Sequence, residues 1–207
     1  MSAETRHPGL NFGDSDVETH NMAESVVFGF WVFLMSDAVL FALLLATYGV
    51  MQAGTAGGPE PRDVFDLKTT FIETMLLLAS SFTFGMVSLA TKYQKSRATM
   101  LLWLGLTFAF GAAFIGMEIR DFATMSSMGA RYDRSGFLSA FYTLVSAHGL
   151  HVLIGCIWIL VVVAQVFAIG IDSALKISIL RLGLFWHFLD IVWVAIFSVV
   201  YLQGSLT

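Results

Sequence analysis

The sequence predicts an all-α integral membrane protein, built as a bundle of five transmembrane helices. The 207 residues are 57% hydrophobic and 13% charged, whereas soluble domains are about 25% charged. The mean hydropathy is +0.78. Five apolar stretches follow one another, and each has at least the roughly 20 residues that cross a hydrocarbon core about 30 Å thick.

The predicted spans are residues 26–51, 71–90, 100–119, 136–169 and 177–202. The first span follows a polar tail, and the second follows a turn-rich loop that holds two of the three prolines. The fourth is long enough to be strongly tilted or to project beyond the lipid. All three prolines lie outside the spans, so the helices are expected to be continuous.

The polar tail and the overall charge exclude several classes of protein. Residues 1–24 lack an apolar segment, so we expect an aqueous tail and no cleavable signal peptide, with the membrane bundle in residues 25–207. The net charge of −4 offers no basic surface for nucleic acid. A single cysteine, Cys156, excludes an internal disulfide and a C-x-x-C redox motif.

The orientation in the membrane follows from a short basic loop. Lys92, Lys95 and Arg97 lie between the second and third spans, with no acidic residue among them. Cytoplasmic loops carry an excess of lysine and arginine, so this loop is expected in the cytoplasm. The N-terminus is then cytoplasmic and, because the number of spans is odd, the C-terminus is periplasmic.

The fifth span carries an ionisable pair, His187 and Asp190, in an otherwise apolar segment flanked by Trp186 and Trp193. Three residues apart, the pair lies on one helical face, within reach of each other or of one neighbouring helix. Such a pair costs several kcal/mol when it meets lipid, so this face is expected to pack against protein.

Three further acids lie within the spans. Asp37 is near the midplane of the first span, where it acts either in a proton relay or as a buried, hydrogen-bonded carboxyl. Glu73 and Glu118 lie near span ends, where interfacial water or headgroups solvate a side chain, so a positioning role is favoured over catalysis. No catalytic residue is predicted.

His148 and His151 repeat the three-residue spacing in the fourth span. Buried imidazoles on one helix face more often donate to a carboxylate or a carbonyl than bind a metal, and a zinc site needs further ligands. No metal site is therefore predicted. We expect His148, His151, His187 and Asp190 to make polar contacts between the fourth and fifth spans.

Lipid contact is predicted from basic side chains at the membrane boundary, which bind anionic phosphates, and from tryptophan, which anchors at the interface. The lipid-binding candidates are Trp31, Arg62, Lys92, Arg97, Trp186 and Trp193.

Several runs of the sequence are similar to a known family. They are F-G-F-W-V-F-L-M-S-D (28–37), G-T-A-G-G-P (54–59), F-I-E-T-M-L-L-L-A-S-S (71–81), F-I-G-M-E-I (114–119), D-R-S-G-F-L-S-A-F (133–141), H-G-L-H-V (148–152) and L-F-W-H-F-L-D-I-V-W (184–193). In this order they resemble subunit III of the haem-copper terminal oxidases, and most closely the five-span subunit III of cytochrome bo-type ubiquinol oxidases. Longer members have two more helices, and many carry a glutamate where this chain has Asp37.

The resemblance implies a non-catalytic subunit of a proton-pumping ubiquinol oxidase in the bacterial inner membrane. Haem and copper are then held by the catalytic subunit I, and the other partners are subunit II and a small subunit IV. The chain binds phospholipid and sustains turnover. Its five histidines and single cysteine are too few to hold the haem and copper centres itself. Asp37 is expected to face the catalytic subunit rather than lipid.

Two other functions remain as alternatives. A small membrane cytochrome b would use His148 and His187 as axial haem ligands. A proton-coupled transporter would use Asp37 and Glu73, although the spans are unbroken and no inverted repeat is evident.

Overall fold

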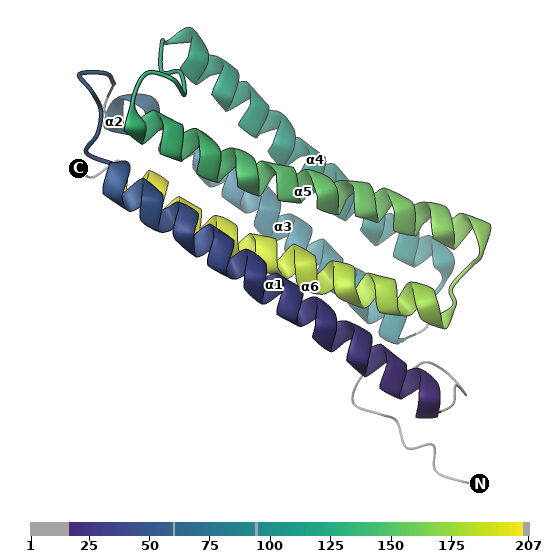
Figure 1. Ribbon diagram of the computed structural model, residues 1–207. Coiled ribbons are helices and arrows are strands. Elements are labelled where there is room, and N and C mark those ends of the chain that lie inside the picture. Colours follow the sequence, from purple (N-terminus) through teal and green to yellow (C-terminus); the bar gives the residue numbers. More distant parts are fainter. Residues whose placement is uncertain (1–16, 60, 94, 205–207) are drawn as a thin grey trace, which may run out of the picture.

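The structure is a computed structural model and describes residues 17–59, 61–93 and 95–204. Its long helices lie side by side in an elongated bundle (Figure 1). The helical segments are α1 (Val17–Met51), the short α2 (Pro61–Val64), α3 (Leu67–Lys92), α4 (Arg97–Ser127), α5 (Gly136–Ala168), α6 (Ser173–Ile196) and the π-helical segment η1 (Phe197–Leu202).

Among the described residues, five segments are long and apolar enough to cross a membrane, which confirms the predicted all-α, five-span class. They are Ala23–Met51, Leu67–Lys92, Arg97–Ser127, Gly136–Ala168 and Ser173–Leu202. Residues 1–16 of the predicted polar tail lie outside the described part of the chain. The start of α1 and the end of η1 lie at opposite ends of the bundle, as an odd number of spans requires (Figure 1).

The later long helices begin at residues suited to capping. The side chains of Asp66, Ser96, Ser135 and Asp172 each accept a hydrogen bond from a backbone N–H of the first turn. At Asp66, hydrogen bonds from the Thr69 hydroxyl and the Lys68 N–H hold the pKa of the carboxyl below its usual value. Glycines with positive φ, Gly129 and Gly170, follow α4 and α5 and end them.

Helix α6 is central, since it packs against α1, α3 and α5, while α4 packs against α3 and α5. Trp186 of α6 is 1% exposed, and its Nε1–H donates a hydrogen bond to Ser80 Oγ of α3 at 2.9 Å. Cβ atoms at Gly111 of α4 and Gly155 of α5 would lie 2.9 and 2.8 Å from the indole ring. One side chain therefore joins α6 to three helices, and two of these contacts require glycine.

Candidate functional site

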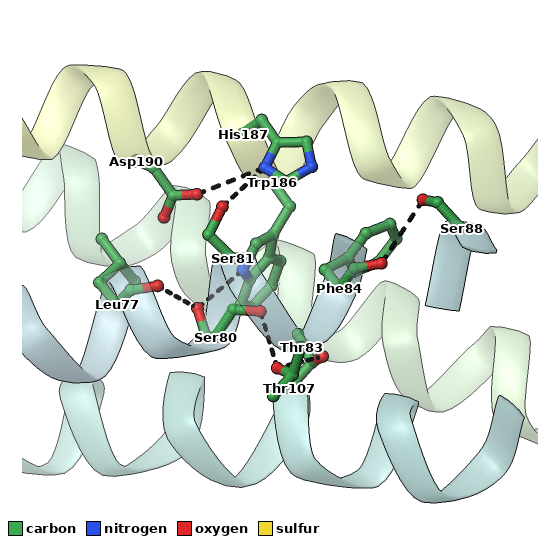
Figure 2. Close-up of polar contacts among 10 residues, drawn as sticks. All are labelled: Leu77, Ser80, Ser81, Thr83, Phe84, Ser88, Thr107, Trp186, His187 and Asp190. Atoms are coloured by element: carbon green, nitrogen blue, oxygen red, sulfur yellow. Dashed lines mark hydrogen bonds and ion pairs between the residues drawn. The ribbon is translucent and has the colours of Figure 1, made fainter. Parts of the chain in front are cut away.

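His187 and Asp190 meet on the side of α6 that faces α3 (Figure 2). His187 Nδ1 lies 2.7 Å from Ser81 Oγ and 3.7 Å from Asp190 Oδ2. The pair is therefore within ion-pair distance, as its spacing indicates. The Asp190 side chain is 9% exposed and neither of its oxygens has a hydrogen-bond partner, whereas the His187 side chain is 48% exposed.

Ser81, His187 and Asp190 are not arranged as a catalytic triad. In a triad the nucleophile and the acid meet different nitrogens of the imidazole ring. Here both oxygen atoms approach Nδ1, and the second ring nitrogen points away from them (Figure 2). The arrangement orients His187, but the carboxyl and the hydroxyl share one ring nitrogen, so the ring does not connect them as a triad does.

Asp37 lies between α1 and α5, opposite His151. Asp37 Oδ2 is 3.8 Å from His151 Nε2, and both side chains are mostly buried, at 13% and 19% exposure. His151 Nδ1 is 2.6 Å from the Ala147 carbonyl oxygen, which can only accept a hydrogen bond. Nδ1 therefore carries a proton, and Nε2 is the atom that faces the carboxyl group.

His148 is fully buried, and neither ring nitrogen has a hydrogen-bond partner. Three aromatic rings surround it: Trp193 at 5.2 Å between ring centroids, Phe114 at 5.8 Å and Phe41 at 6.3 Å. These rings come from α6, α4 and α1, so His148 of α5 fills a junction of four helices.

Glu73 and Glu118 lie at the end of the bundle where α3 begins and α4 ends. They are 2% and 5% exposed, so they are buried in the bundle rather than placed where headgroups solvate them. The Glu118 carboxyl packs on Gly149 of α5, and one oxygen of each glutamate has no hydrogen-bond partner. Asp121 and the Tyr201 side chain interact electrostatically with both glutamates.

The polar contacts of the histidines and Asp190 differ from the expected link between the fourth and fifth spans. Those of His187 run from α6 to α3, and those of His151 run from α5 to α1. The physical reason is the rotation of each helix about its own axis. The face of α6 that carries His187 points to α3, and the face of α5 that carries His151 points to α1. A hydrogen bond that does join α5 to α6 runs from Trp158 Nε1 to Ser178 Oγ, at 3.2 Å.

The lipid-binding candidates divide into two sets. Trp186 and Trp193 are each 1% exposed and donate indole N–H bonds to Ser80 and Thr74 of α3, so they cannot contact lipid. The exposed candidates are Trp31, Arg62, Lys92 and Arg97. Lys92 and Arg97 lie at one end of the bundle, where α3 passes into α4, and Arg62 lies on α2 at the other end.

Sequence reasoning missed the side chains that receive these bonds. Ser81, Ser80 and Thr74 gave no signal because hydroxyl side chains are common in membrane helices. Asp121 could have been found from its position one turn after Glu118.

The positions of the described side chains do not bring three potential metal ligands together. Within residues 17–59, 61–93 and 95–204, no three histidine, cysteine or acidic side chains come together as a metal site would require. The His148 ring is packed against aromatic rings, and His187 Nδ1 is engaged with Ser81.

Comparison with known proteins places these features in a family. The profile of cytochrome c oxidase subunit III matches residues 13–205. Cytochrome bo(3) ubiquinol oxidase subunit 3 of Pseudomonas aeruginosa is 46% identical over 194 residues, which cover 94% of this chain and 92% of the relative. Cytochrome c oxidase subunit 3 of Bacillus sp. strain PS3 is 42% identical, covering 85% of this chain and 84% of the relative. Quinol oxidase subunit 3 of Bacillus subtilis is 39% identical, covering 86% and 87%.

Proposed function

The chain belongs to the cytochrome c oxidase subunit III family, and from this premise we propose that it is the non-catalytic subunit III of a cytochrome bo-type ubiquinol oxidase. The observation that carries the proposal is the 46% identity with the Pseudomonas aeruginosa subunit, which extends over 94% of this chain. A similarity of this length includes all five spans and their loops. It favours an oxidase subunit over a separate membrane cytochrome b or a transporter.

The role of the chain is structural. Its intramembrane polar side chains hold helices together, as in the bonds from Trp186 and Trp193 to α3. Haem and copper, which carry the electron transfer and oxygen reduction, are proposed to reside in the catalytic subunit I. Subunit II and a small subunit IV complete the complex in the bacterial inner membrane.

Phospholipid is proposed to bind at the exposed basic residues. Lys92 and Arg97 lie at one end of the bundle and Arg62 lies at the other (Figure 1). Each membrane surface therefore has basic residues that can bind lipid phosphates. Basic side chains at these depths attract lipid phosphates. If the end with Lys92 and Arg97 is cytoplasmic, the end of η1 is periplasmic, which keeps the orientation expected from the basic loop.

The test is purification of the membrane complex through an affinity tag on this chain. The expected result is a haem-containing oxidase that oxidises ubiquinol. Purification of this chain without any haem protein, from membranes that contain an active oxidase, would contradict the proposal.

Reduced cytochrome c is a second candidate electron donor, because the name of one relative includes it. A relative named cytochrome c oxidase subunit 3 is 42% identical to this chain, and a relative named quinol oxidase subunit 3 is 40% identical. Assays of the tagged complex with ubiquinol and with reduced cytochrome c decide between the donors.

A further inference from the structure

The outer surface of α3 and α6 has a polar centre in an apolar surround. Its members, here called the His187 face, are Leu78 and Phe82 of α3 and His187, Ile191 and Val194 of α6. The two α3 residues flank Ser81, which is bonded to His187, and the α6 residues recur at helical spacing. All five side chains are exposed, with Phe82 at 69% and Ile191 at 70%.

The polar centre lies at the depth where a membrane protein is least able to use water. The span Ser173–Leu202 has 30 residues, and His187 is at its middle. At a rise of about 1.5 Å per residue, roughly ten residues separate this depth from either edge of the hydrocarbon core. Phospholipid headgroups therefore do not reach His187, and acyl chains offer it no hydrogen bond.

Hydrogen bonding at this centre is incomplete. Nδ1 of His187 is engaged with Ser81, but no described residue hydrogen-bonds Nε2. Behind the ring, Asp190 Oδ2 comes no closer to His187 Nδ1 than 3.7 Å, which is longer than a hydrogen bond. Polar groups in hydrocarbon are unfavourable unless they are bonded, and ionisable residues within spans face protein or a hydrated cavity.

We propose that the His187 face docks a transmembrane helix of another subunit of the oxidase, and that this helix presents a hydrogen-bonding group to His187 Nε2. The inference rests on the proposed function, because it takes the chain to be part of a complex with other membrane subunits. A protein helix is the occupant because it brings a hydroxyl, amide or carboxyl group to this depth and also covers the apolar side chains around His187.

The apolar surround fits the same occupant. Helix association in a membrane depends on close packing and on hydrogen bonds between helices, not on exclusion of water. Phe82 of α3 and Ile191 of α6 supply exposed apolar area, and Ser81 together with Asp190 orients the ring. The face thus combines one oriented polar group with a broad apolar surface.

The docking surface is tested by photo-crosslinking in the intact membrane. A photoreactive amino acid is placed at Phe82 or at Ile191, both exposed, so neither replacement disturbs the buried core. The matched control is Ile154, which is 46% exposed near the middle of α5, a helix that does not contribute to the face. We expect a crosslink to another oxidase subunit from Phe82 and Ile191, and none from Ile154.

The polar contact is tested by His187→Leu and His187→Gln, measured as the ratio of this chain to haem in the purified oxidase. Leucine fills similar space without a hydrogen bond, and we expect loss of the chain from the complex. Glutamine keeps a donor and an acceptor, and we expect the wild-type ratio.

Three results would overturn the inference: crosslinks from Phe82 and Ile191 to lipid or a second copy of this chain alone, crosslinks equally strong from Ile154, or a wild-type ratio for His187→Leu. Each is separate from failure of the proposed function. That failure would appear earlier, as the absence of a haem protein when the unaltered chain is purified.

Discussion

Helices α1 and α6 are similarly apolar but are held in the bundle in different ways. In the most apolar window of α6, 50% of the residues are buried, against 11% in α1. Helix α6 donates two indole hydrogen bonds to α3, while the polar contact of α1 is the 3.8 Å approach of Asp37 to His151. Hydropathy does not separate a central helix from a peripheral one, whereas side-chain hydrogen bonds and glycine contacts do.

The sharpest way to break this comparison is to remove one tryptophan from each helix. Trp186→Ala deletes a buried ring that contacts three helices, and we expect the free energy of unfolding to fall by about 3–5 kcal/mol. Trp31→Ala is the matched control, because Trp31 is 50% exposed on α1. Unfolding in mixed micelles measures both. Equal losses from the two variants would mean that the indole contacts do not distinguish the helices.

Because α5 approaches α6 closely, filling the contact is expected to cause a second, smaller loss in the free energy of unfolding. Gly155→Ala places a methyl group 2.8 Å from the rigid Trp186 ring, and overpacking of this kind costs about 1–3 kcal/mol. Gly105→Ala on α4 meets nothing within 4 Å and is expected to leave stability unchanged or slightly raised. The same unfolding assay compares them, and an unaffected Gly155→Ala variant would show that α6 tolerates displacement.

The cap at the start of α3, the helix that receives both indole bonds, predicts a further loss of stability when it is removed. Asp66→Ala removes the cap and is expected to cost about 1 kcal/mol or less, since the side chain is exposed. Hydrogen exchange of the peptide covering residues 66–70 measures the opening of the first turn. Asp66→Asn is the control, because asparagine keeps the capping oxygen.

The lowered pKa of Asp66 sets the pH dependence of this effect. A carboxyl whose pKa is depressed in the folded state stabilises it above the pKa of the unfolded chain, and the stabilisation is lost as pH falls through the folded pKa. The protection in the wild-type chain should therefore fade at acid pH, while that of the Asp66→Asn variant stays level. Parallel curves for the two proteins would contradict this.

The sequence predicted the class, the five spans and the proximity of His187 to Asp190, because span length and a three-residue spacing are local properties. It did not predict that Trp186 and Trp193 point inward. Their acceptors, Ser80 and Thr74, lie 106 and 119 residues earlier in the chain. The helices are also apolar on nearly every side, so the polar–apolar contrast that identifies the core face of a soluble helix is weak.

The smallest effect is expected where α1 meets α5. A double-mutant cycle with Asp37→Asn and His151→Gln isolates the interaction between the two side chains. Because the atoms are 3.8 Å apart and no hydrogen bond joins them, we expect a coupling free energy of about 0.6 kcal/mol, the average for polar pairs between membrane helices. A coupling of several kcal/mol would place Asp37–His151 on a par with the Trp186 contacts. Helix α1 would then be fixed by its polar pair, and the contrast with α6 would be one of burial alone.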